Sequence, residues 1–356
     1  MKYIHKDDSM IIEISIAEVE KWNLIVKSFD NYDVFYLNEY VRAFMYESKA
    51  NGVPVLLYYE NEADKAINVV FKRDISDDNH FLGKLEAGKW YDLISPYGYG
   101  GFLGNVTDYV TMNKQYTDYC IECGYICEFV RFELFGDYFS QYDGEVETRT
   151  HNVIRNLEMS LEEMWMDFKQ KVRKNVKRAN KNNLELIVEN TGEYLSEFLR
   201  IYYGTMDRSD ADRNFYFSEN FFREIMKMKD NAMFFHAFYQ GKLISTELVI
   251  YGAENAYSYL GGTDREYFDL RPNDFLKYEI IKWAKEKGLK NFVLGGGYGA
   301  DDGIFQYKTC LAPNGIVDFY IGRKIFDEQK YEYLLNLRAE DAPECIESKF
   351  FPKYRG

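Results

Sequence analysis

The chain repeats one order of expected elements: three strands, a helix and a further strand. In the first half the hydrophobic pattern predicts strands at 53–60, 66–74 and 90–94, a helix at 106–123 and a strand from 125. In the second half it predicts strands at 231–239, 242–251 and 255–262, a helix at 273–287 and a strand at 291–297. A duplication of this kind favours an α/β (α+β) chain of two related domains, each a mixed β-sheet flanked by helices.

Further helices are expected before each repeated unit. A Ser-Leu-Glu-Glu capping box at 160–163 opens a long helix that we expect to run to about residue 180. Shorter helices are expected at 38–48, 193–203 and 218–228. The polar segment 142–151 has no strong period and predicts the boundary between the domains, and the C-terminal segment 342–356 is not expected to form a core of its own.

Length and composition fit a packed soluble protein. The 356 residues suffice for about two domains, and 46% of them are hydrophobic and 29% charged. The longest apolar stretches, such as 53–59, are far shorter than the ~20 residues that a membrane-spanning helix needs. The N-terminal segment lacks the features of a signal peptide, and five scattered cysteines suit a reducing compartment. We therefore expect a cytoplasmic protein with no transmembrane segment.

One segment is strongly basic although the chain is acidic. The net charge of −14 argues against a protein that coats nucleic acid non-specifically. Between residues 169 and 181, however, seven cations surround an apolar stripe at helical spacing. This helix is either a solvated surface or a docking surface for the phosphates of RNA or of a nucleotide. The candidates for docking are Lys169, Arg173, Lys174, Lys177 and Arg178.

Two glycine clusters follow expected strands, at 96–101 and 295–297. Glycine lets a backbone approach a ligand and lets amides point at an anion, although a tight turn without a ligand explains the same pattern. Neither cluster is a dinucleotide fingerprint, and the sequence has no phosphate-binding Walker motif. It also lacks the HExxH and GxSxG motifs, and its close cysteines have no second ligand pair, so we expect neither a metal site nor a serine hydrolase.

A set of polar residues remains in the tyrosine- and phenylalanine-rich second half. Arginine suits bidentate binding of phosphate, and lysine suits a point charge beside a developing oxyanion. Each of these residues could instead form a surface salt bridge. The set comprises Thr205, Arg208, Arg213, Asp301, Asp302 and Lys308.

Several segments together resemble the Fem-type aminoacyltransferases, a branch of the GNAT-like acyltransferases that adds amino acids from aminoacyl-tRNA to peptidoglycan precursors. The similar segments cover most of the chain: PYGYGG at 96–101, FVRF at 129–132, VRKNVKRANKNNLEL at 172–186, YYGTMDRSDADRNFYF at 202–217, YLGGTDREYFDLRPNDFLKYEIIKWAKEKG at 259–288 and LGGGYGADDGIFQYK at 294–308. The resemblance implies tandem GNAT-like domains at 1–147 and 148–323, and a tail at 324–356 that returns to the first domain. The coiled-coil arm of some members has no counterpart here, since no long heptad segment is present.

The resemblance also implies roles for individual residues. Arg208 would bind substrate phosphate, and Lys308 would lie at the reaction centre or at its phosphate site. Asp301 is a candidate polar orienter, and no dedicated general base is identified. The remaining substrate-binding candidates are Arg213, Tyr97, Tyr99, Tyr259, Gly261 and Gly262.

These implications lead to one expected function and two alternatives. The leading hypothesis is transfer of an aminoacyl group from aminoacyl-tRNA to an amine of a peptidoglycan or related precursor, without a cofactor and with at most peripheral contact to a membrane-linked substrate. The first alternative uses acetyl-CoA to acetylate an amino sugar or polysaccharide. Typical GNAT enzymes bind the CoA pyrophosphate with a Q/RxxGxG/A loop that follows the third strand of the meander. Here that position is occupied by TDREYFDLRPN at 263–273, which lacks this glycine spacing and puts CoA binding in doubt. The second alternative is a non-enzymatic, degenerate duplicate that binds a glycan or a partner through an aromatic cleft.

Overall fold

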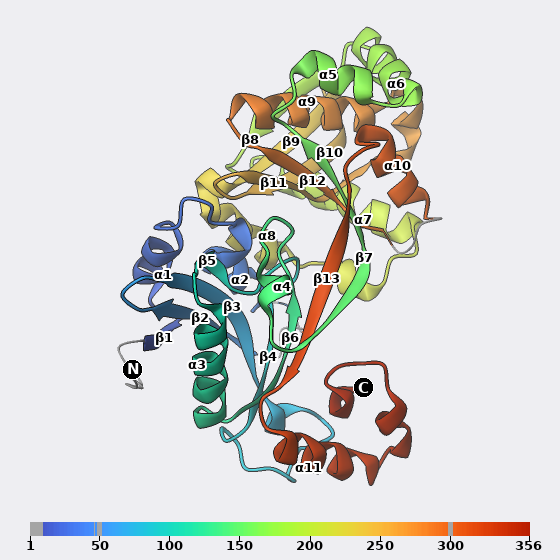
Figure 1. Cartoon of the computed structure of the whole chain (residues 1–356). Helices are drawn as coiled ribbons and strands as arrows, with labels where there is room; N and C mark the ends of the chain where they lie inside the picture. Colours follow the sequence, from blue (N-terminus) through green and yellow to red (C-terminus); the bar gives the residue numbers. More distant parts are fainter. Residues whose placement is uncertain (1–9, 46, 48–51, 298–301) are drawn as a thin grey trace. The chain divides into compact units, whose positions relative to one another are not determined.

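The computed structural model describes residues 10–45, 47, 52–297 and 302–356 (Figure 1). The chain divides into two compact units: unit 1 contains 1–29, 35–149 and 319–356, and unit 2 contains 30–34 and 150–318. The boundaries expected from the sequence, 147/148 and 323/324, differ by a few residues from those at 149/150 and 318/319. Unit 1 includes the C-terminal segment, where the buried Tyr354 donates a hydrogen bond to Asp92.

Unit 1 is built on a mixed sheet. Strands β1, β2, β3 and β4 are antiparallel neighbours, whereas β4 and β6 are parallel and α3 connects them. Strand β13 pairs with β6, and β5 pairs with β3. The strands are β1 (Met10–Ser15), β2 (Val53–Glu60), β3 (Lys65–Asp74), β4 (Tyr91–Ile94), β5 (Leu103–Asn105), β6 (Tyr125–Arg131) and β13 (Ile316–Ile325). The helices are α1 (Val19–Val26), α2 (Asn38–Phe44), α3 (Tyr109–Glu122), α4 (Tyr138–Gln141) and α11 (Glu328–Ala339).

The strands of unit 2 pair in a similar way. Strands β8, β9, β10 and β11 are antiparallel neighbours, β12 is parallel to β11, and β7 pairs with β12. The strands are β7 (Glu145–Asn156), β8 (Glu185–Glu189), β9 (Ala232–Tyr239), β10 (Lys242–Tyr251), β11 (Asn255–Thr263) and β12 (Asn291–Gly295). The helices are α5 (Leu161–Asp167), α6 (Gln170–Lys181), α7 (Leu195–Arg208), α8 (Glu219–Ile225), α9 (Pro272–Glu286) and α10 (Gly303–Leu311).

The two units repeat one pattern of pairing. In unit 1 the meander β2–β3–β4 leads through α3 to the parallel strand β6, and in unit 2 the meander β9–β10–β11 leads through α9 to the parallel strand β12. The expected α/β fold with two tandem, GNAT-like domains is confirmed.

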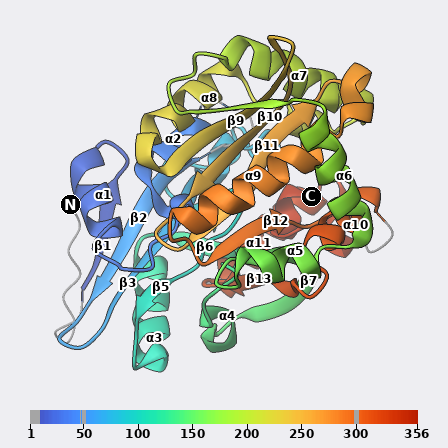
Figure 2. The same ribbon diagram turned by 90° about the horizontal axis from the view of Figure 1, so that it is seen from above.

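Helices cover both faces of the sheet in unit 2. Along β9, Phe235 and Ala237 belong to the core that contains α9, whereas Phe234 contacts the ring of Phe198 in α7 and His236 contacts the ring of the residue that precedes α7. Side chains alternate across a strand, so α7 and α9 lie on opposite faces, as Figure 2 shows. Helices α5 and α6 pack beside α9, because Val172, Val176 and Ala179 of α6 belong to the same core.

The prediction of one long helix over 160–180 is wrong. The capping box forms as predicted, with Ser160 and Glu163 bonded to each other's backbone, but α5 ends at Asp167 and α6 starts at Gln170. Phe168 and Lys169 between them are extended. The ring of Phe168 is buried in the core, and the Arg173 guanidinium donates to the carbonyl oxygens of Met166 and Phe168 that the break leaves free.

The segment 142–151, where the sequence predicts the boundary between the domains, lies largely in β7, and the division between the two units at 149/150 falls within it. The first residues of β7 are polar and exposed, so they show no alternation that would indicate a strand. Within the described residues, no helix is both long and apolar enough to cross a bilayer.

Candidate functional site

A cavity of about 540 Å³ opens in unit 2 between β10, β11, α7, α9 and α10. Among the described residues, those that line it all lie between 171 and 308, within unit 2. Five of the described lining side chains are cationic, namely Lys171, Arg208, Arg271, Lys277 and Lys308, whereas two are acidic, Glu247 and Asp274. The cavity therefore favours a ligand that carries negative charge.

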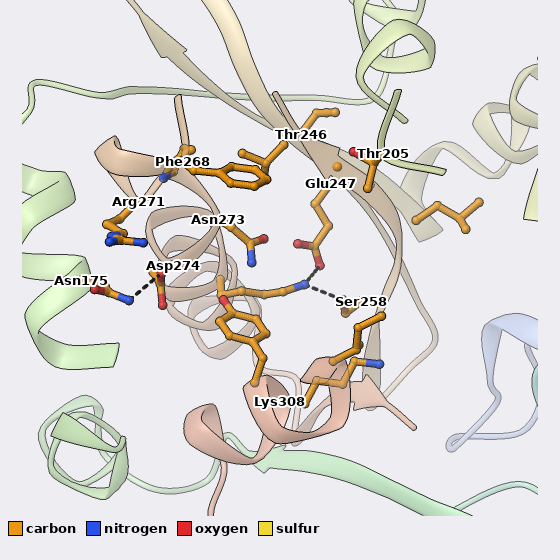
Figure 3. Close-up of a pocket in the computed structure, with 18 of the residues that line it drawn as sticks. Asn175, Thr205, Thr246, Glu247, Ser258, Phe268, Arg271, Asn273, Asp274 and Lys308 are labelled. Atoms are coloured by element: carbon orange, nitrogen blue, oxygen red, sulfur yellow. Dashed lines mark hydrogen bonds and ion pairs between the residues drawn. The ribbon is translucent and has the colours of Figure 1, made fainter. Parts of the chain in front are cut away.

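A buried ion pair lies in this cavity. Lys277 of α9 donates to Glu247 of β10 at 2.5 Å and to the hydroxyl of Ser258 at 2.6 Å (Figure 3). Glu247 and Lys277 are only 4% and 8% exposed. Both charges are matched by a partner, so Lys277 is held as a fixed cation at the cavity wall.

Lys308 lines the same cavity from α10. Its ammonium group donates to the carbonyl oxygen of Gly296 at 2.6 Å, just beyond the end of β12. Burial and the nearby charge of Lys277 lower the pKa of Lys308 to about 8. A lysine of this kind holds a proton at neutral pH and can release it near pH 8.

The glycine cluster at 295–297 lies directly against this lysine. Gly295 has a φ of +85°, and a Cβ atom there would lie 3.2 Å from the Lys308 ammonium nitrogen. The glycine cluster thus lets another group come close to the backbone, as the sequence indicated. That group is the side chain of Lys308 of the chain itself.

Arg208 lies at another edge of the cavity, at the end of α7. Its guanidinium is bonded to Thr205 at 3.3 Å and lies 5.1 Å from the centre of the Phe268 ring. The side chain is exposed, and it also borders a neighbouring cavity of about 470 Å³. Arg208 is therefore accessible to a large anion.

Gly261 and Gly262 line the cavity together with Tyr259. A Cβ atom on Gly262 would lie 2.3 Å from the Thr205 hydroxyl oxygen, and one on Gly261 would lie 2.4 Å from the Thr246 carbonyl oxygen. These two glycines are needed for the close packing of β11 against α7 and β10, whether or not a substrate touches them.

The other predicted site residues lie elsewhere. Tyr97 and Tyr99 belong to unit 1, where Tyr99 packs edge-on against Phe35 and Phe319. Arg213 stacks on Tyr216 outside the cavity lining. Asp301 lies outside the described residues. Asp302 caps α10 by accepting from the backbone of Ile304 at 2.9 Å.

The predicted basic surface lies on α6, with Lys174, Lys177 and Arg178 exposed. Lys169 is exposed at the N-terminus of α6, whereas Arg173 is used within the protein to bond the end of α5. The same helix contributes Lys171 and Asn175 to the cavity, so the basic surface and the cavity are continuous through α6.

The sequence analysis missed the residues that carry the cavity's internal polar contacts: Asn175, Glu247, Ser258, Arg271, Asp274 and Lys277. A signal existed for two of them. Glu247 is the only acid in the apolar run from Leu243 to Tyr251, and Lys277 lies on the buried face of α9. A charged residue at a core position is rarely buried without a partner.

Comparison with protein families matches residues 167–309 to the acetyltransferase (GNAT) domain. This range contains every described residue that lines the cavity. The cavity therefore belongs to the part of the chain that resembles known acyltransferases.

Curated relatives include lipid II:glycine glycyltransferases of staphylococci. The enzyme of Staphylococcus haemolyticus is 27% identical over 96 residues, and that of Staphylococcus epidermidis is 25% identical over 97 residues. Each match covers 27% of this chain, and the matched segments span 22% and 23% of the relatives' own length.

Among solved structures, FemX aligns with a TM-score of 0.66 at 12% identity, covering 95% of this chain and 100% of FemX. This chain has the fold of FemX. A conserved protein of unknown function from Bacteroides thetaiotaomicron aligns with a TM-score of 0.57 at 11% identity and covers 88% of the chain and 98% of that protein. The expected resemblance to Fem-type aminoacyltransferases is confirmed.

Proposed function

We propose that this chain is an acyltransferase that moves an aminoacyl group from aminoacyl-tRNA to an amine of a peptidoglycan precursor. The observation that carries the proposal is the cationic cavity with Lys308, which lies wholly within the segment similar to GNAT acyltransferases. The names of the staphylococcal relatives support an aminoacyl group and a cell-wall acceptor.

The reaction joins an amine to an ester carbonyl carbon. The acceptor nitrogen attacks that carbon and loses a proton, the new C–N bond forms, and the C–O bond to the RNA ribose breaks as the ribose oxygen takes up a proton. Negative charge develops on the carbonyl oxygen during the attack. We assign Lys308 to this oxygen, because its ammonium group lines the cavity and its backbone partner at Gly296 holds it in place.

Arg208 is assigned to the diphosphate of the acceptor. Its guanidinium is exposed at the cavity edge and presents several N–H donors, which match the oxygens of a phosphate. The exposed cations of α6 are assigned to the RNA backbone, since α6 also contributes to the cavity wall. Asp301 remains a proposed orienter.

A second candidate is acetyl transfer from acetyl-CoA, which the acetyltransferase description of the matched domain favours. The start of α9 argues against it. Pro272 at the first helical position has no N–H to offer, and Asp274 in the first turn places a buried carboxylate where a pyrophosphate would need donors. The aminoacyl donor therefore agrees better with this cavity.

The test compares the two donors on the full chain. Purified protein is incubated with charged tRNA or with acetyl-CoA, each with lipid-linked and nucleotide-linked muropeptides as acceptors, and the products are analysed by mass spectrometry. We expect an aminoacylated muropeptide with charged tRNA and none with uncharged tRNA. Acetylated product from acetyl-CoA, or no product from charged tRNA, would contradict the proposal.

A further inference from the structure

One side of the cavity contains a buried carboxylate with a free acceptor. Asp274 is 6% exposed, and its Oδ2 atom accepts from the Asn175 amide at 3.1 Å (Figure 3). Its other oxygen, Oδ1, is buried and has no hydrogen-bond partner among the described residues. A buried polar atom without a partner is unfavourable, so a donor from a ligand is the natural complement.

Two further polar atoms at this cavity are also unsatisfied. Both Arg271 Nε and Tyr307 Oη are buried without a partner in the described part of the chain. Arg271 precedes α9 with a left-handed φ of 61°, and Tyr307 belongs to α10. Helix α9, the residue that precedes it and helix α10 therefore bring an acceptor, a donor and a hydroxyl to one cavity, and backbone strain at Arg271 is typical of a binding site.

The chemistry of this set restricts the ligand. The carboxylate of Asp274 only accepts hydrogen bonds, and the Nε atom of Arg271 only donates one, so the ligand must both donate and accept. A bare anion would be repelled by Asp274. A bare cation would be repelled by Arg271 and Lys171, the two cations whose charges act on that carboxylate.

Neighbouring hydroxyl groups of a sugar meet these conditions, because each hydroxyl donates one hydrogen bond and accepts others without a charge. The excess of cations around the rest of the cavity favours a phosphate attached to the same ligand. In Figure 3, Asn175, Arg271 and Asp274 lie on the side of the pocket opposite Ser258 and Lys308. A ligand of some length could thus reach both sides.

We propose that Asn175, Arg271, Asp274 and Tyr307 form a diol subsite that binds the vicinal hydroxyls of a phosphorylated sugar. This inference rests on the proposed function: transfer of the aminoacyl group leaves the 3′-terminal ribose of the tRNA with both hydroxyls free, and a muropeptide acceptor contains a phosphorylated hexosamine. The sugar is either the ribose of a 3′-terminal nucleotide or a hexosamine phosphate, and the experiment separates these sources.

The experiment measures binding of ligands that carry no acyl group to the full chain, by calorimetry or ligand-observed NMR. The ribose probes are AMP, 2′-deoxy-AMP, 3′-deoxy-AMP and 2′,3′-dideoxy-AMP, and the hexose probe is N-acetylglucosamine 1-phosphate. We expect one of the two parent sugars to bind. If it is AMP, removal of one hydroxyl should weaken binding about tenfold, because a charge-assisted hydrogen bond is lost.

Protein variants complete a double-mutant cycle. Asp274→Asn should weaken binding of the parent sugar about tenfold. It should leave nearly unchanged the binding of a deoxy probe that lacks the hydroxyl bonded to Asp274. Tyr307→Phe removes only a hydroxyl that has no partner in the described chain, so folding should be unaffected while binding weakens. The matched control Asp118→Asn changes an exposed acid on α3 of unit 1, and it should bind as wild type does.

Several outcomes would overturn the subsite. They are equal binding of AMP and dideoxy-AMP when AMP is the parent sugar, wild-type binding by both Asp274→Asn and Tyr307→Phe, or no binding of any sugar phosphate. Binding of a blocked dipeptide amide in place of the sugars, weakened by Asp274→Asn, would assign the subsite to a peptide instead. These probes cannot react, so binding and transfer are measured separately. Transfer from charged tRNA without binding of any sugar probe would refute the subsite and leave the proposed function standing. Binding of a sugar probe without transfer from charged tRNA would refute the proposed function and leave the subsite standing.

Discussion

At the residue scale, Asp274 combines deep burial with a raised affinity for protons. Removal from water raises the pKa of its carboxyl to about 6, against 3.8 for an ordinary aspartate. The native state therefore binds a proton more tightly than the unfolded state does. Stability is lost as pH rises from about 4 to about 6, and the cost of the buried charge is fully present above that range.

This shift predicts that Asp274→Asn stabilises the protein at pH 7.5 by roughly 1–3 kcal/mol, because the buried charge is removed and the bond to Asn175 is kept. Near pH 4 the wild-type carboxyl is largely protonated in the native state, so the difference should shrink. Urea unfolding at both pH values measures it. A variant that is less stable than wild type at pH 7.5 would show that the carboxylate is structural.

Lys308 has a lowered pKa of about 8, so its ammonium form is present below that pH and is lost above it. If this ammonium group stabilises the oxyanion, the transfer rate should fall as pH rises through about 8. Lys308→Arg should keep some activity without this alkaline decrease, since arginine stays charged. The measurement is the single-turnover rate between pH 6 and 9.5, the range that brackets this pKa.

Lys277→Gln provides the companion test. It removes the neighbouring positive charge that lowers the pKa of Lys308 and leaves an amide that can bond Glu247. The alkaline decrease should therefore move to higher pH. A decrease at the same pH in wild type, Lys308→Arg and Lys277→Gln would mean that another group titrates.

At the scale of elements, the position of α10 depends on a buried arginine of β7. Arg155 is 2% exposed, donates to the Leu311 carbonyl oxygen at 2.7 Å and forms an ion pair with Asp167. It bonds the last residue of α10, the helix that carries Lys308.

Arg155→Met should destabilise the protein by about 3 kcal/mol, because Asp167 and a buried carbonyl lose their partner. It should also lower the transfer rate, because α10 is less firmly held. The control is Arg149→Met, an exposed arginine on the same strand, which should change stability by less than about 0.5 kcal/mol. Equal unfolding midpoints for the two variants would contradict this role.

The sequence predicted the elements that are regular and locally determined. Both meanders were predictable because their apolar residues alternate and their turns are short, as at Gln240 and Gly241, both of which have positive φ. Strand β7 was missed because its first half is exposed and its pairing partner β12 lies far along the chain. The break at Phe168 was missed because the apolar stripe of α6 continues the helical period of α5.

The candidate site was predicted less well, for a physical reason. Lys308 and Arg208 come from segments that resemble a family, whereas Glu247 and Lys277 are 30 residues apart and meet only when α9 packs on β10. The unsatisfied atoms of Asp274, Arg271 and Tyr307 depend on side-chain geometry at the start of α9 and in α10, which no local pattern encodes.

At the scale of the whole molecule, the proposed function requires an acidic chain to bind an anionic donor through local charge. The net charge is −14, so we expect binding of RNA to depend on the exposed cations of α6 and on the cavity. Lys174→Glu with Lys177→Glu should weaken tRNA binding at least tenfold and reduce its dependence on salt concentration, because phosphate contacts are lost.

The control for this surface is Lys114→Glu, which changes an exposed lysine on α3 of unit 1. It should alter binding only slightly. Filter binding between about 50 and 200 mM salt measures both variants. Equal affinities and equal salt slopes for wild type and the α6 variant would show that RNA docks elsewhere.

The most direct test of the central claim is the single-turnover transfer rate of Lys308→Ala with charged tRNA and a muropeptide acceptor, measured beside Lys287→Ala, an exposed lysine at the end of α9 outside the cavity lining. A cation that stabilises the oxyanion contributes at least about 100-fold. We predict a loss of that size for Lys308→Ala, with an unchanged melting temperature and a normal rate for Lys287→Ala. Equal rates for the two variants would contradict the assignment of this cavity as the site of acyl transfer.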